Sequence, residues 1–226
     1  MCVIIVMNKK LASLEILKQC EERNGDGGGV SWIENDMVRY KKGIKSEEIF
    51  DIITEKGAPC VAHFRISTTG GVSSELCHPF IVSKKSPNPT SGSVNEVLFH
   101  NGVWSKWDRY MVDSVVKEGL EIPGGIWSDS RALAWYAAIK NKSFLGFIGQ
   151  KIAIQSKRGI DQWGDFEEKD GISYSNTNWV PFVSKGIGAG CYGGELYNRK
   201  GKYHENYPAL HKMTDSQWYD YMKQNE

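Results

Sequence analysis

The sequence has almost no net charge, because its 28 Lys and Arg residues are balanced by 27 Asp and Glu residues, leaving +1. A nucleic-acid-binding arm or a surface that binds anionic lipid needs a clear excess of positive charge, so neither partner is expected. The aromatic content, with 8 Trp, 10 Tyr and 8 Phe, argues against a disordered chain. At 226 residues, the composition fits one large domain, or one domain with an appendage.

Long hydrophobic runs are absent as well, since no apolar stretch approaches the roughly 18 residues of a membrane-spanning helix. The short run over residues 3–7 follows no basic segment and precedes no small-residue cleavage site, so we interpret it as a buried strand. The five cysteines are odd in number and scattered along the chain, unlike those of a secreted disulfide scaffold. We therefore expect reduced thiols and a cytoplasmic location.

The spacing of apolar residues predicts strands at both ends of the region up to residue 180, with helices between them. Ser46 is expected to cap a helix, and the Ser- and Pro-rich segment 81–96 is expected to be a surface loop. This order suggests two sheets with helices packed outside them. The predicted helices are 10–23, the one after Ser46, 108–118 and 129–139; the predicted strands are 29–33, 37–41, 60–67, 97–101, 151–155 and 171–174.

Periodicity is lost after residue 180, where Gly, Tyr and Lys dominate. We therefore predict a domain over residues 1–180 and an irregular C-terminal tail over 181–226. A capping-box spacing from Thr214 to Gln217 predicts one short helix near the end of this tail. The tail is expected to serve docking or closure of a site rather than chemistry.

Cys2 is the first candidate for chemistry. The initiator Met is normally removed when a small residue follows it, and Cys2 would then carry both a thiol and a free α-amine. The amine has a pKa of about 7.7–8.0, so it is suited to act as a general base for its own side chain. The alternative is a buried Cys that packs as a small hydrophobic residue at the start of a strand.

Five further elements follow Cys2 in a fixed order, and together they carry a resemblance. They are the turn Asn24-Gly25-Asp26-Gly27-Gly28-Gly29, the run His63-Phe64-Arg65-Ile66-Ser67-Thr68-Thr69-Gly70, then Cys77-His78-Pro79-Phe80, Leu98-Phe99-His100-Asn101-Gly102 and Trp127-Ser128-Asp129-Ser130. In this order the chain resembles the glutaminase domain of class II glutamine amidotransferases, which are N-terminal-nucleophile hydrolases. The resemblance covers residues 2–130 and weakens after about residue 140.

The resemblance implies an α+β fold, an αββα sandwich of two antiparallel sheets, and a role for each element in glutamine chemistry. Arg65 is the candidate cation for the substrate α-carboxylate, because its planar fork binds a carboxylate in a bidentate manner. The resemblance also implies that Asp129 binds the substrate α-ammonium and that Thr68 lies near the substrate carboxylate. Asn101 and Gly102 would form the oxyanion hole. The residues implied to shape the pocket are Asp26, Gly27 and His78.

Each assignment has a structural alternative. Arg65 could form a surface salt bridge, Asp129 could be a helix N-cap, and Asn101-Gly102 is a strong hairpin signal. We favour the oxyanion hole over the hairpin because residues 103–107 make a poor second strand. Cys60-x-x-His63 and Cys77-His78 could provide half of a zinc site, but no second pair is present, so neither a metal nor a cofactor is expected.

The function expected from the resemblance is release of ammonia from L-glutamine through a Cys2 thioester. The chain has no second domain large enough for a typical synthase, so a synthetase or transferase on another chain is expected to use the ammonia. If water is the acceptor, the protein is a plain amide hydrolase. Two alternatives stay open: an amidase acting on another γ-glutamyl amide, and a catalytically silent binding module of the same fold.

Overall fold

The apolar run near the N-terminus forms strand β1 (Val3–Met7), and all of its side chains are buried. Because side chains alternate along a strand, they contribute to two cores. Val3, Ile5 and Met7 belong to the core beneath the first two helices, whereas Ile4 and Val6 belong to the core between the two sheets. A strand buried on both faces has a continuous apolar sequence, and this explains the absence of alternation here.

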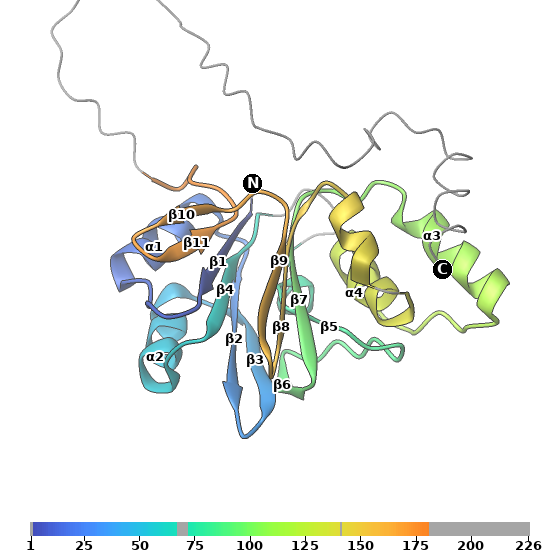
Figure 1. The fold of residues 1–226 in the computed structure, drawn as a ribbon, viewed down its shortest axis with the longest axis horizontal. Helices are drawn as coiled ribbons and strands as arrows, with labels where there is room; N and C mark the ends of the chain where they lie inside the picture. Colours follow the sequence, from blue (N-terminus) through green and yellow to red (C-terminus); the bar gives the residue numbers. More distant parts are fainter. Residues whose placement is uncertain (1, 67–71, 141, 181–226) are drawn as a thin grey trace, which may run out of the picture. The chain divides into compact units, whose positions relative to one another are not determined.

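The computed structural model of the protein describes residues 2–66, 72–140 and 142–180, which form two antiparallel sheets with helices outside them (Figure 1). The larger sheet has the strand order β10–β11–β1–β4–β2–β3–β6, and the smaller has the order β5–β7–β8–β9. The remaining strands are β2 (Gly28–Glu34), β3 (Met37–Ile44), β4 (Cys60–Phe64), β5 (Phe80–Ile81), β6 (Ser91–Val94), β7 (Glu96–Asn101), β8 (Lys151–Ser156), β9 (Gly159–Trp163), β10 (Glu167–Lys169) and β11 (Ile172–Tyr174).

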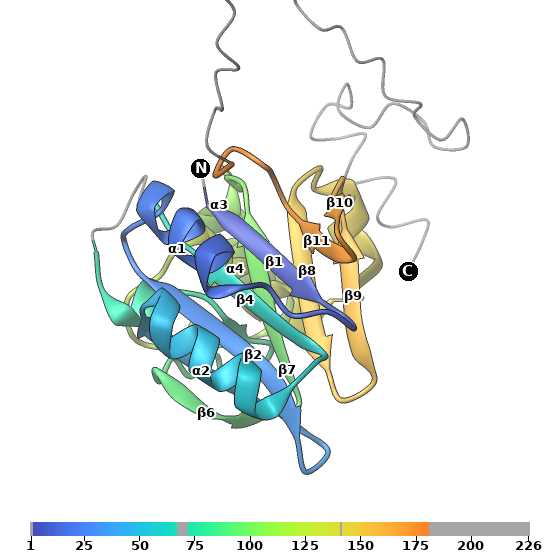
Figure 2. The same cartoon turned by 90° about the vertical axis from the view of Figure 1, so that its left-hand side faces the viewer.

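Helices α1 (Leu14–Arg23) and α2 (Ser46–Lys56) cover the outer face of the larger sheet, as Figure 2 shows from their side. Helices α3 (Trp107–Glu118) and α4 (Asp129–Ile139) lie on the far side of the smaller sheet (Figure 1). Short 3₁₀ turns occur at Ser74–Leu76 and Lys142–Phe147. This arrangement confirms the α+β class and the αββα sandwich expected from the sequence.

Two predicted helix starts differ from the structure. The helix predicted from residue 10 begins at Leu14, because Ser13 is its N-cap and accepts a hydrogen bond from the Ile16 backbone N–H. Ser46 is not the cap of α2, whose N-cap is Lys45. Ser46 is the first helical residue, and its hydroxyl donates to Glu21 of α1 instead. The serine therefore joins the two helices that share this face of the sheet.

The segment 81–96 is not only a loop, and this prediction is wrong in part. Ser91–Val94 forms strand β6, which pairs with β3 at the edge of the larger sheet. Strands β9 and β10 were not predicted either. All three are polar or largely exposed, so they lack the apolar pattern from which strands are predicted.

Strand register brings the N-terminus beside two other chain segments. Val3 pairs with Phe64 of β4, and Phe64 also pairs with Gly28 of β2. One further step of the antiparallel register places Cys2 opposite Arg65, on the face of the sheet that looks toward the second sheet. The start of β1, the end of β4 and the start of β2 therefore meet at one edge of the sandwich.

Among the described residues, no helix has both the length and the apolar character needed to cross a bilayer. The tail over 181–226, with the helix expected near Thr214, lies outside the described residues. The boundary between residues 180 and 181 therefore stays a prediction.

Candidate active site

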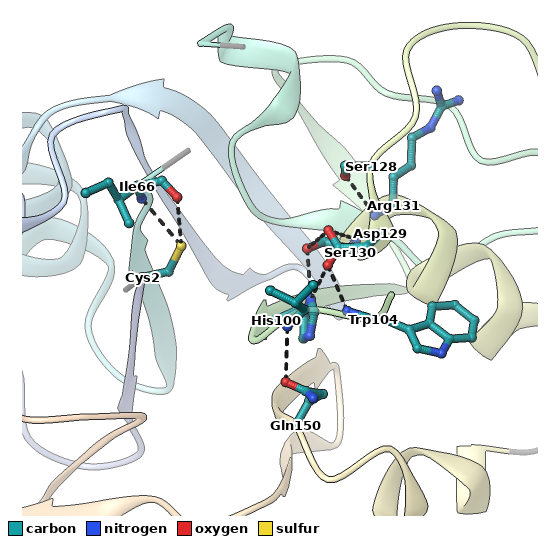
Figure 3. Close-up of polar contacts among 10 residues, drawn as sticks. Cys2, Ile66, His100, Trp104, Ser128, Asp129, Ser130, Arg131 and Gln150 are labelled. Carbon is teal, nitrogen blue, oxygen red and sulfur yellow. Dashed lines mark hydrogen bonds and ion pairs between the residues drawn. The ribbon is translucent and has the colours of Figure 1, made fainter. Parts of the chain in front are cut away.

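Cys2 stands directly before β1, and its half-buried thiol contacts the main chain that follows β4. The Ile66 backbone N–H donates to Sγ over 3.4 Å, and Sγ lies 3.5 Å from the Ile66 carbonyl oxygen, to which the thiol donates (Figure 3). Arg65 precedes this residue and is 7% exposed, so it is not a surface salt-bridge residue. Burial raises the pKa of the Cys2 thiol, while the Ile66 backbone contact and the Arg65 charge lower it in part. The thiol is therefore in its protonated form at neutral pH.

The glycine-rich turn packs against the same segment. The Asp26 backbone N–H donates to the Arg65 carbonyl (2.9 Å), and the Arg65 N–H donates to the Gly27 carbonyl (3.0 Å). Gly27 has φ +117°, and a Cβ there would overlap the Cys77 sulfur, so glycine is required for both conformation and space. The structure thus brings Asp26 and Gly27 beside Arg65, one residue from the contact of the Cys2 thiol.

Asn101, the last residue of β7, points toward the N-terminal strand. Its Nδ2 donates to Ser175 Oγ (2.8 Å), and the same oxygen accepts from the Ile4 backbone N–H (2.8 Å). Asn176, which follows Ser175 in the sequence, donates from Nδ2 to the Cys2 carbonyl oxygen (2.6 Å). The segment after β11 therefore ties β7, β1 and the backbone of Cys2 together.

Ser175 and Asn176 were not predicted as site residues from the sequence. No local pattern marks them, since their positions depend on the pairing of β11 with β1, in which Ile5 lies opposite Tyr174. The sequence shows only that a Ser and an Asn directly follow the short strand β11, which does not by itself indicate a site. Both residues are nearly or fully buried, so their polar groups need the partners described above.

Asn101 and Gly102 do not form a two-residue hairpin. Strand β7 ends at Asn101, the described chain then turns into α3, and β7 pairs with β5 and β8 instead. The structural alternative to the oxyanion hole is therefore excluded by the topology. The catalytic use of these residues stays a prediction.

Asp129 is the first residue of α4, but it is not the N-cap. Ser128 is the cap, and its hydroxyl accepts from the Arg131 backbone N–H. The Asp129 carboxylate accepts from the backbone N–H of Ser130 (2.8 Å) and from that of Trp104 (3.1 Å). Figure 3 shows this carboxylate between α4 and the loop after β7. The alternative in which Asp129 only caps its helix is wrong, because Ser128 has that role.

Arg131 fixes the chain that leads into α4. Its buried guanidinium donates to the carbonyl oxygens of Ser86 (2.6 Å), Gly124 (2.8 Å) and Ile126 (2.7 Å), and it stacks on Trp127 with 4.2 Å to the ring centroid. Charged hydrogen bonds to three separate carbonyls hold the loop in one conformation. The position of Asp129 depends on this loop.

Three histidines, His63, His78 and His100, are buried. The rings of His63 and His78 are 4.0 Å apart between centroids, and His100 Nδ1 is 2.9 Å from Ser130 Oγ. Burial lowers the pKa of His63 to about 3 and that of His100 to about 4, and it lowers the pKa of His78 well below its usual value. All three rings are neutral at neutral pH. The His78 carbonyl packs against Gly29, where a Cβ would overlap it.

The site residues predicted from sequence therefore fall into two groups. Cys2, Arg65, Asp26 and Gly27 share one set of backbone contacts, and Asn101 is connected to Cys2 through Ser175 and Asn176. Gly102 belongs to the loop between β7 and α3, and Asp129 is the first residue of α4. Thr68 lies outside the described residues. Within the described part of the chain, no group of three His, Cys, Asp or Glu side chains is placed to hold a metal ion.

Comparison with known proteins gives a structural match without a sequence match. No protein-family model matches the chain, and no curated protein matches it. Among solved structures, the chain is similar to one described as the allosteric regulatory enzyme of purine biosynthesis, at 15% sequence identity and a TM-score of 0.50. The match covers 77% of this chain but 41% of that one, so the chain spans less than half of its neighbour's length. At this level of identity, the likeness shows a shared fold.

Proposed function

We propose that this protein hydrolyses the side-chain amide of L-glutamine through an N-terminal Cys2 nucleophile and thereby releases ammonia. One observation supports this most directly. Cys2 lies at the edge where β1, β4 and β2 meet, with its thiol on the Ile66 main chain next to Arg65. Its backbone carbonyl is connected through Asn176 and Ser175 to Asn101. A nucleophile, a carboxylate-binding cation and an oxyanion donor are the groups that amide hydrolysis of an amino acid needs.

The mechanism follows from these groups. The Cys2 sulfur attacks the amide carbon while its own α-amine, freed by removal of Met1, accepts the thiol proton. Asn101 Nδ2 and the Gly102 N–H stabilise the oxyanion. The amine passes the proton to the leaving nitrogen, ammonia departs, and water then hydrolyses the thioester to give glutamate. Arg65 binds the substrate α-carboxylate, with Thr68 beside it, and Asp129 binds the α-ammonium.

The raised pKa of the Cys2 thiol favours a mechanism in which a nearby base accepts the thiol proton. A thiol that is protonated at neutral pH is a weak nucleophile until a base accepts its proton. Once Met1 is removed, Cys2 itself carries an α-amine, and such an amine has a pKa of about 7.7–8.0. We also propose that a synthetase or transferase on another protein chain uses the ammonia, because the glutaminase-like fold accounts for the described residues.

The test is release of glutamate and ammonia from L-glutamine, with labelling by an electrophilic glutamine analogue as a second measurement. Activity on glutamine with one label on Cys2 supports the proposal. Activity on another γ-glutamyl amide alone would assign a different substrate, and neither turnover nor label would identify a silent binding module. A matched control is Cys77→Ala, because Cys77 is also a thiol near Arg65.

Arg65→Ala should weaken glutamine binding by about 2–5 kcal/mol, because it leaves the substrate carboxylate without its buried partner. The expected change is in KM, with a smaller change in kcat. Arg39→Ala is the matched control, since Arg39 is an exposed arginine paired with Glu34. Equal and small effects of both variants on KM would place Arg65 outside the substrate site.

Asn101→Ala should instead lower kcat by roughly 10²–10³-fold, because it removes a donor that acts on the oxyanion. Ser175→Ala separates this effect from structural damage, because it breaks the Asn101–Ser175 hydrogen bond and keeps the carboxamide. We expect a smaller loss for Ser175→Ala. If both variants lose activity equally, Asn101 acts only through its structural hydrogen bond.

A further inference from the structure

The start of β8 contacts both groups to which we assign oxyanion binding, and this inference rests on the proposed function. Lys151 is the first residue of β8 and pairs with Asn101 of β7. In an antiparallel ladder the next step places Gln150 opposite Gly102. Gln150 and Lys151 therefore lie beside the two proposed donors without being part of the sequence motifs.

Gln150 holds the loop that contains Gly102. Its Oε1 accepts a hydrogen bond from the Val103 backbone N–H (3.2 Å). Its side-chain amide also occupies the space next to the Gly102 Cα, where a Cβ would overlap it. The following backbone N–H, that of Trp104, donates to Asp129 (3.1 Å). The peptide groups after Gly102 are thus fixed from two sides.

Lys151 holds the other donor through one intermediate residue. Its Nζ donates to the Ser175 carbonyl oxygen, and Ser175 Oγ accepts from Asn101 Nδ2 (2.8 Å). A carboxamide nitrogen carries two hydrogens, so the bond to Ser175 leaves the second one to bind an oxyanion. The bond to Ser175 also fixes the plane of the amide and hence the direction of that second hydrogen.

We propose that Gln150 and Lys151 are positioning residues that set the geometry of the Gly102 N–H and the Asn101 carboxamide before the oxyanion forms. Neither touches the substrate. Oxyanion donors accelerate a reaction because they are already oriented, and a displacement of about 1 Å can cost roughly 10²-fold in rate. The register of one strand pair thus aligns both donors of the proposed oxyanion hole.

Gln150→Met tests the first half of the proposal, since it keeps the side-chain length and removes the acceptor. We expect kcat to fall by roughly 10- to 100-fold while KM stays within about twofold. We also expect faster hydrogen exchange at the Val103 amide. The matched control is Gln162→Met, which makes the same replacement at an exposed position on β9. Equal kinetics for the two variants and unchanged exchange at Val103 would overturn the role of Gln150.

Lys151→Met and Lys151→Arg test the second half, and they keep the proposal testable if Gln150→Met does not fold. Met should lower kcat with little change in KM, and Arg should restore most of the loss because it keeps a donor. Unchanged kcat in Lys151→Met would overturn the role of Lys151. A wild-type protein that turns over no glutamine would contradict the proposed function instead, and exchange at Val103 would then still decide whether Gln150 holds the loop.

Discussion

Replacing Cys2 with Ala should remove glutamine hydrolysis and leave the protein folded. The substitution deletes the proposed nucleophile, so we expect kcat to fall by at least about 10³-fold. The thiol is half-buried, and within the described part of the chain its sulfur makes two long hydrogen bonds, both to the Ile66 main chain. The free energy of unfolding should therefore change by less than about 1 kcal/mol.

The measurement is steady-state release of glutamate by wild type, Cys2→Ala and the three other described cysteines replaced one at a time. Cys20 and Cys60 are fully buried, and burial raises the pKa of the Cys20 thiol well above its usual value and that of the Cys60 thiol to about 12. These variants should keep their activity where they fold. Labelling of Cys60 or Cys77 by a glutamine-like electrophile, with Cys2 unlabelled, would show that the assignment is wrong.

Mild acid should strongly destabilise the protein, because three histidines are buried in neutral form. Their pKa values lie at about 3 for His63, about 4 for His100 and well below the usual value for His78. In the unfolded chain each would titrate near 6.5. The unfolded state therefore binds more protons below about pH 6.5, and stability is present above this pH and lost as the pH falls.

The expected loss is large compared with the stability of a domain. Three protons give a slope of about 4 kcal/mol per pH unit once the unfolded histidines are protonated, which amounts to about 6 kcal/mol between pH 7 and pH 5. Total stabilities are about 5–15 kcal/mol. The buried Lys42, whose pKa burial lowers to about 7, adds a pH dependence above pH 7 and none in the acid range.

Urea denaturation at pH values from 7 to 5 measures this effect. The slope should decrease by about one third in His78→Gln if that variant folds, because one titrating group is removed. A free energy of unfolding that stays constant from pH 7 to pH 5 would contradict the neutral histidine group.

Much of the fold could be predicted because the buried elements carry strong local patterns. Strands β1, β4, β7 and β8 are apolar runs, and α2 and α4 have helical spacing with acidic residues in their first turns. Strands β6, β9 and β10 could not be predicted in the same way. They are exposed, and they are strands because a neighbouring strand pairs with them.

The candidate site likewise contains residues that local motifs predict and residues that only strand pairing brings into place. Cys2, Arg65, Asn101 and Asp129 were identified through motifs whose order along the chain is specific. Ser175, Asn176, Gln150 and Lys151 were missed, because their contacts arise from the register of β11 with β1 and of β8 with β7. Pairing register between distant segments has no local signature in one sequence.

The central claim is that the α-amine of Cys2 acts as the base for its own thiol, and the state of the N-terminus tests it most directly. Two preparations of the same chain are compared, one beginning at Cys2 and one with Met1 retained, each verified by intact mass. We predict that only the chain beginning at Cys2 hydrolyses glutamine, with a pH dependence set by an amine titrating near 7.7–8.0. Full activity from chains that still carry Met1 would contradict the N-terminal-nucleophile mechanism.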